Sequence, residues 1–194
     1  MPANTVRLFW GFALPKPVVP LAGNLRTLVD DPKQVVRWVH GRNIHLTVRF
    51  IGDTSADAIE SIAAGVGDKL ADQEPFILRI AGTGVFPAPR RPRVLWLGIE
   101  EEYDCLKTIE RLIHEALDPL GFPREEREFM PHVTIGRVRY PAKATPGVNN
   151  FLGAEYDPII CSLNSIILYE SRIGEKGLEY APISTINFKL IGQE

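Results

Sequence analysis

The chain carries one four-residue pattern twice. Residues 45–48 (His-Leu-Thr-Val) and 132–135 (His-Val-Thr-Ile) both read His-x-Thr-x, and they lie 87 positions apart. The same offset relates Leu8 to Leu95 and Gly11 to Gly98. Each copy reads as an apolar strand, a helical stretch and a His-x-Thr strand. The pattern therefore predicts two matching half-domains, each of which presents one imidazole to a shared site.

Size and composition limit the class of protein. The 194 residues fit one compact domain, and 45% hydrophobic with 24% charged residues is typical of a globular protein. No apolar run approaches the roughly 20 residues that span a bilayer, and the first residues do not resemble a signal peptide, so we expect a cytoplasmic protein without a membrane partner. Cys105 and Cys161 lack metal-ligand spacing and are expected to be buried free thiols.

Hydrophobic periodicity locates the secondary structure. We expect strands at 7–13, 44–51, 76–85, 93–99, 132–138, 159–170 and 180–190, helices at 17–30, 56–70 and 103–117, a turn at 52–54, and a loop or short helix at 141–153. Strands and helices mix without strict alternation. That order favours an α+β fold with largely antiparallel sheets.

The two motifs have the residue types of an acid–base site. Alternation along each strand puts the His and the Thr on one face, opposite the apolar residues, and it places Arg49 on the face of His45 and Thr47. Two opposed imidazoles suit in-line displacement at phosphorus, where one His deprotonates the attacking group and the other protonates the leaving oxygen. Thr47 and Thr134 can bind phosphoryl oxygens. We therefore take His45 and His132 as the candidate catalytic pair.

Arg137 is a candidate phosphate ligand, because a guanidinium can bind phosphate through two parallel hydrogen bonds. Strict alternation points its side chain away from His132, but a β-bulge at Gly136 would return it to the site. We expect His132 to be the base and His45 the acid, because Arg137 would hold the phosphate against the second motif. The alternative is a surface arginine at the end of a strand.

Other interpretations of these residues stay open. His45 and His132 could be structural strand residues, or two ligands of a metal site that lacks obvious carboxylate or Cys companions. Net charge is −2, so contact with nucleic acid must come from a local basic patch. The densest such cluster is Arg90, Arg91 and Arg93, beside Phe86. It could follow an RNA backbone next to a stacked base, or form a solvated loop.

Four segments together resemble a known family: residues 43–52, 84–98, 131–137 and 168–171. They are similar to the bacterial and archaeal RNA 2′,3′-cyclic phosphodiesterases, also known as 2′-5′ RNA ligases, of the 2H phosphoesterase superfamily. The resemblance runs from about Arg7 to about Phe188. It implies a single domain over 1–194, made of two interleaved, pseudo-symmetric lobes, with sheets lining a central cleft and helices outside. It also implies that no cofactor is required, since the family needs neither metal nor ATP.

The resemblance also implies an activity. Family members open a 2′,3′-cyclic phosphate at an RNA end to leave a 2′-phosphate, and the reverse reaction, with a 5′-hydroxyl attacking, explains the ligase name. Carried over by position, His45 and His132 are catalytic, and Thr47, Thr134 and Arg137 bind substrate. The expected partners are RNA ends with a cyclic phosphate, such as tRNA fragments, and the expected state is a monomer. The alternatives are a phosphodiesterase for 2′,5′-oligonucleotides or small cyclic nucleotides, and a non-catalytic nucleotide- or RNA-binding module.

Overall fold

The computed structural model describes residues 4–100, 104–124, 128–139, 144–174 and 177–189, and within them nine strands form one antiparallel sheet. The strands are β1 (Thr5–Ala13), β2 (Val36–Trp38), β3 (His45–Ser55), β4 (Phe76–Phe86), β5 (Val94–Glu100), β6 (His132–Val138), β7 (Ile159–Leu163), β8 (Ser165–Gly174) and β9 (Gly177–Asn187). The helices are α1 (Val18–Arg26), α2 (Ile59–Lys69), α3 (Asp104–Leu117) and α4 (Asn149–Leu152). None of the helices in these ranges is long and apolar enough to cross a membrane.

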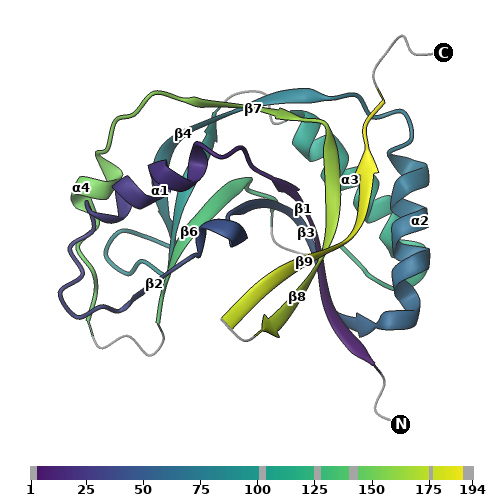
Figure 1. Cartoon of the computed structure of the whole chain (residues 1–194), viewed down its shortest axis with the longest axis horizontal. Helices are drawn as coiled ribbons and strands as arrows, with labels where there is room; N and C mark the ends of the chain where they lie inside the picture. The colour runs from purple at the N-terminus through teal and green to yellow at the C-terminus, as the bar shows by residue number, and fades with distance from the viewer. Residues whose placement is uncertain (1–3, 101–103, 125–127, 140–143, 175–176, 190–194) are drawn as a thin grey trace.

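The order of the strands is symmetric about the two motif strands. The sheet runs β7-β4-β5-β6-β3-β1-β8-β9, with β2 added alongside β6. Figure 1 shows α1 and α4 on the side of β4 and β6, and α2 and α3 on the side of β3 and β8. Since α1 follows β1 in the chain but lies on the side of β4 and β6, the two halves are interleaved. The duplicated α+β fold is confirmed, with one curled sheet in place of separate sheets.

The core lies between this sheet and the helices. Leu46 and Val133, the apolar residues inside the two motifs, are fully buried. In α3 the buried Ile109 and Ile113 are four residues apart, and in α2 Ile62 and Val66 have the same spacing, so each helix turns one apolar stripe inward. This packing fixes which face of the motif strands is buried and leaves the His and Thr side chains on the other face.

A β-bulge interrupts each motif strand at the same place. The β1–β3 register skips Val48, and the β5–β6 register skips Ile135, so the bulges are 87 residues apart like the motifs. Each bulge exchanges the faces of the residues that follow it. Arg137 returns to the exposed face, as the sequence predicted. The prediction that Arg49 shares the face of His45 was wrong, because the bulge turns Arg49 into the core and Phe50 outward.

Other differences follow from local pairing. Gly52 has a φ of 84° inside β3, so the expected turn at 52–54 is a second bulge in a strand that continues to Ser55. The expected strand at 159–170 is two strands, β7 and β8, and the short β2 was not expected. In the first half Gly11 of β1 pairs with Thr47, and in the second half Trp96 of β5 pairs with Thr134. Gly11 therefore corresponds to Trp96, so β1 and β5 are related by an offset of 85 residues and not by the 87 residues that separate the motifs. Cys161 is buried, whereas Cys105 is exposed.

Candidate active site

The two motifs lie directly against each other in the middle of the sheet. Leu46 pairs with Val133 in the antiparallel register between β3 and β6. One step to either side, this register sets His45 opposite Thr134 and Thr47 opposite His132. All four side chains are half-buried and lie on the face opposite the core. The fold therefore brings the predicted pairs together, each His facing the Thr of the other motif.

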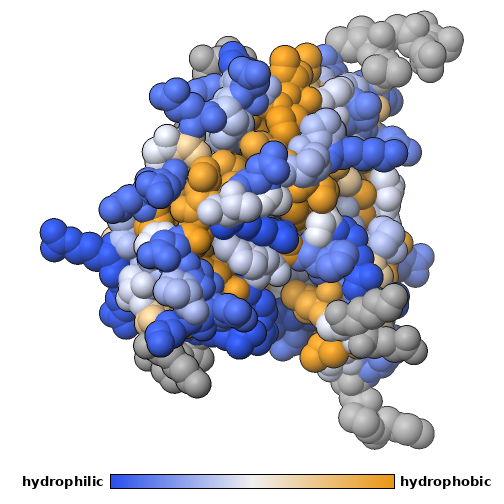
Figure 2. All heavy atoms as spheres, turned by 60° about the vertical axis from the view of Figure 1, so that its left-hand side comes forward, coloured by the Kyte–Doolittle hydropathy of each residue, from blue (hydrophilic) through white to orange (hydrophobic). Residues whose placement is uncertain are grey.

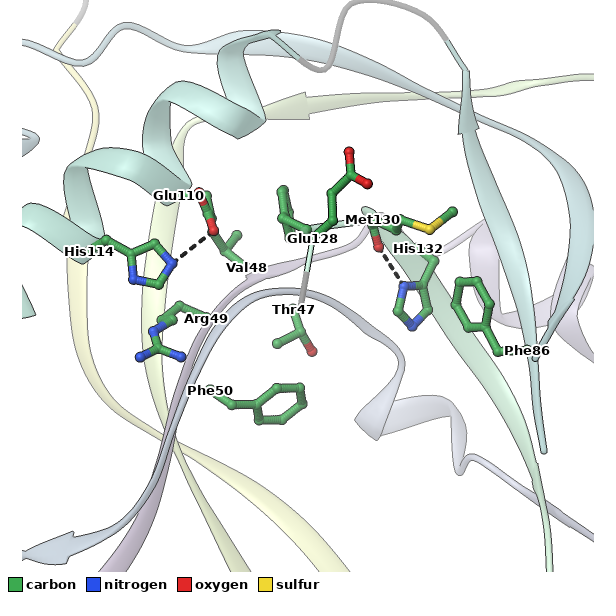
Figure 3. A pocket seen from close by; sticks show the side chains of 11 residues that line it. Thr47, Val48, Arg49, Phe50, Phe86, Glu110, His114, Glu128, Met130 and His132 are labelled. Carbon is green, nitrogen blue, oxygen red and sulfur yellow. Dashed lines mark hydrogen bonds and ion pairs between the residues drawn. The ribbon is translucent and has the colours of Figure 1, made fainter. Parts of the chain in front are cut away.

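Both imidazoles are held in the same way. The Nδ1 atom of His45 lies 2.7 Å from the carbonyl oxygen of Asn43, and that of His132 lies 2.7 Å from the carbonyl oxygen of Met130 (Figure 3). A carbonyl oxygen only accepts, so each Nδ1 carries the proton and each neutral ring has its lone pair on Nε2. The Nε2 of His45 lies 2.8 Å from the Thr47 hydroxyl, which donates to it. The tautomer suits proton transfer at Nε2.

His45 sits in an aromatic surrounding. Its ring centroid lies 4.8 Å from Phe9, 4.8 Å from Tyr180 and 6.3 Å from Tyr169. Burial among these rings disfavours the charged imidazolium and lowers the pKa of His45 from 6.5 to about 4; the charges of Arg137 and His132 act in the same direction, against the hydrogen bond to Asn43. His45 is therefore neutral at neutral pH in the free protein.

His132 has aromatic neighbours of its own. Its ring lies 5.0 Å from Phe86 in an edge-on arrangement and 6.2 Å from Trp96. The sequence placed Phe86 beside the basic cluster as a platform for a stacked base. The structure places its ring against His132.

The basic cluster lies away from His132. Arg90 and Arg91 are exposed in the turn between β4 and β5. This turn meets the far end of β6, where the Val138 amide donates to the Arg93 carbonyl at 2.9 Å.

The site opens into two adjoining cavities. The larger, of about 790 Å³, is lined by four of the predicted residues: His45, Thr47, Thr134 and Arg137. The smaller, of about 220 Å³, is lined by His132 together with Thr47, Phe50, Phe86, Glu110 and Glu128 (Figure 3). Thr47 and Phe50 line both cavities. The five predicted site residues thus surround one continuous region, with the two imidazoles in different cavities.

A buried polar cluster in the wall of the smaller cavity was not predicted. The Nε2 of His114 lies 2.8 Å from Glu110 Oε1 (Figure 3), and Arg49 donates from Nη2 to the carbonyl of Pro123 at 2.5 Å. The side chains of Arg49, Glu110 and His114 are all buried. The spacing of four residues between Glu110 and His114 on a helix was the available signal. Among the described residues no group of three His, Cys, Asp or Glu side chains is arranged to hold a metal ion.

A match to a family model establishes which family of proteins the chain belongs to. The model described as "2'-5' RNA ligase superfamily" matches residues 17–173. The chain belongs to the 2′-5′ RNA ligase superfamily. A protein from Aeropyrum pernix, named RNA 2′,3′-cyclic phosphodiesterase, is 35% identical over 82% of this chain and 92% of its own length. One of the same name from Methanothermobacter thermautotrophicus is 34% identical over 70% of this chain and 73% of its own.

Solved structures of two other proteins have the same fold. TT0787 of Thermus thermophilus superposes with a TM-score of 0.77 and 23% identity over 94% of this chain and 97% of its own. LigT of E. coli, solved in complex with 3′-AMP, superposes with a TM-score of 0.74 and 23% identity over 96% of this chain and 99% of its own. These likenesses confirm the fold expected from the sequence.

Proposed function

We propose that the protein hydrolyses the 2′,3′-cyclic phosphate at an RNA end and leaves a 2′-phosphate, without a metal ion. The observation that carries this proposal is the matched pair of imidazoles. Each donates from Nδ1 to a backbone carbonyl at 2.7 Å, so that Nε2 is the atom that can exchange a proton with the substrate. The names of the relatives support the same reaction. A binding module would have no need of two imidazoles fixed in this tautomer.

The reaction needs one proton transfer on each side of phosphorus. Water attacks the phosphorus in line with the 3′ oxygen and gives its proton to Nε2 of one His. The bond between phosphorus and the 3′ oxygen breaks, and that oxygen takes a proton from Nε2 of the other His. The products are a 2′-phosphate and a 3′-hydroxyl. Exchange with solvent then restores the protonation state of both rings. A 5′-hydroxyl in place of water would give a 2′,5′ linkage.

The phosphate would be held by groups that line the larger cavity. Thr47 and Thr134 lie on the same face of neighbouring strands. The Thr134 hydroxyl can donate to one non-bridging oxygen, and the Thr47 hydroxyl can donate to the other once Nε2 of His45 is protonated and no longer accepts from it. Arg137 reaches this cavity because of the bulge at Ile135. A guanidinium there neutralises the negative charge that builds up in the transition state. We assign these three residues to substrate binding.

We propose that His132 is the base and His45 the acid in hydrolysis. A His45 acid must gain a proton when the substrate binds, because its pKa is about 4 in the free protein. Burial is the main cause of that low value and the charge of Arg137 a lesser one. An anionic phosphate in the cavity would cancel the effect of Arg137 and would also favour the charged imidazolium directly. The substrate would therefore load the acid with its proton, and the free enzyme would rest with His45 neutral.

Proton NMR of the His45 ring tests this assignment. The pKa of His45 should rise when a nucleoside 2′-phosphate is bound, by one unit or more for a neighbouring anion within about 4–6 Å. Arg137→Gln should raise the pKa in the free protein and weaken the response to the ligand. A His45 pKa that stays near 4 in the complex would make His45 the base and His132 the acid.

A turnover assay separates this function from its alternatives. We expect wild-type protein to hydrolyse an oligoribonucleotide that ends in a 2′,3′-cyclic phosphate with a higher kcat/KM than a 2′,5′-linked oligonucleotide whose ends are blocked. Binding of the cyclic end without turnover would favour the binding module.

The continuous sheet supports a single domain of two lobes over residues 1–194. The cytoplasmic location, the monomeric state and tRNA fragments as substrates stay predictions.

A further inference from the structure

The unexpected strand β2 adds an arginine beside the phosphate site. In the β2–β6 register Arg37 pairs directly with Arg137, flanked by the pairs Val36–Val138 and Trp38–Gly136. Val36 and Val138 are buried, so alternation puts Arg37 and Arg137 on the opposite, open face. Both arginines are exposed. Figure 2 brings forward the left-hand side of Figure 1, where β2 lies, and hydrophilic side chains cover much of the lower part of this view.

Two arginines directly opposite each other are an unfavourable pair in a protein without ligand. Cβ atoms of such cross-strand pairs lie about 4.5–5.5 Å apart, and like charges at that spacing destabilise the sheet. No hydrogen bond or ion pair to either guanidinium occurs among the described residues. The carboxylate near the start of β2, Asp31, accepts instead from the backbone amides of Val35 and Val36, at 2.8 and 2.9 Å. The pair is therefore suited to bind anions from outside the chain.

We propose that Arg37 binds the phosphodiester one nucleotide upstream of the cyclic phosphate that Arg137 holds. This proposal rests on the proposed function and extends its substrate to RNA of at least two nucleotides. Arg137 lines the larger cavity with Thr134. The strand β2 pairs with the end of β6 that is farther from His132. A strand of RNA leaving the cavity along this face would meet Arg37 next. Two phosphates would then neutralise the two facing charges.

The test compares substrates with one and two phosphates. Uridine 2′,3′-cyclic phosphate has no upstream phosphodiester, UpU with a 2′,3′-cyclic end has one, and its methylphosphonate analogue has an uncharged linkage. Arg37→Gln should lower the preference of kcat/KM for the dinucleotide over the mononucleotide by about tenfold, the size of one charge-assisted hydrogen bond. Most of the change should lie in KM. The salt dependence of dinucleotide binding should fall by about 0.7 in slope, the value for one phosphate of a single strand.

Two comparisons make the outcome specific. With the methylphosphonate analogue, Arg37→Gln should cause no further loss, because the partner charge is already absent. Arg111→Gln removes an exposed arginine of the outer helix α3 that pairs with Glu115, and it should leave the preference unchanged. An unchanged preference in Arg37→Gln, or an equal loss with the analogue, would overturn the Arg37 site. If wild-type protein turned over neither substrate, the proposed function itself would fail.

Discussion

Acid should destabilise this protein through His45 in particular. The pKa of His45 is about 4 in the folded protein and 6.5 without the fold, so between these values the unfolded chain binds the extra proton. The free energy of unfolding must therefore fall as pH drops from about 6.5 to about 4, and be unaffected by this group at higher pH. At 1.36 kcal/mol for each pKa unit, the limit is roughly 3 kcal/mol, of which about 2 kcal/mol is lost by pH 4.5.

Urea unfolding of wild type and His45→Gln at pH 7 and pH 4.5 measures this loss. Wild type should lose about 2 kcal/mol more than the variant over this interval, whatever the difference between them at pH 7. His40→Gln removes an exposed imidazole and serves as the control for the loss of a histidine as such. If wild type and His45→Gln lost the same stability on acidification, the desolvation of His45 by its aromatic neighbours would be refuted.

Three further predictions concern activity. His45→Ala and His132→Ala should each lower kcat about 10²–10⁴-fold, and the double variant should fall well short of the product of the two losses, because the residues act as a unit; near-normal turnover in either single variant would refute the pairing. A 3′ leaving group that needs no proton should restore activity to His45→Ala but not to His132→Ala, and the opposite pattern in kcat would exchange acid and base. Replacing Arg90, Arg91 and Arg93 together should raise KM for oligonucleotides more than for a cyclic mononucleotide, whereas an equal effect on both would remove this turn from RNA binding.

The candidate site could be predicted because its information is local and duplicated. A two-residue period places each His with its Thr, and the repetition of the pattern implied that the two strands belong together. The sequence could not show that they are direct neighbours, since the Leu46–Val133 register depends on how the two halves join. It also could not show the pKa of His45, because Phe9, Tyr169 and Tyr180 come from other strands.

The faces of residues beyond the motifs were predicted only where a bulge was foreseen. A glycine after the second motif suggested a bulge there, and Arg137 was placed correctly. The first motif has Arg49 at the corresponding position, where no glycine marks the bulge at Val48. Strict alternation therefore gave the wrong face for Arg49. The strand β2, only three residues long, is too short for its periodicity to be recognised.

The central claim is hydrolysis of a cyclic phosphate by two histidines without a metal. The most direct measurement is incubation of the protein, in EDTA, with an oligoribonucleotide that ends in a 2′,3′-cyclic phosphate, followed by identification of the product end. We expect undiminished turnover and a 2′-phosphate as the product. A 3′-phosphate product, or activity that EDTA abolishes and a divalent ion restores, would contradict the account.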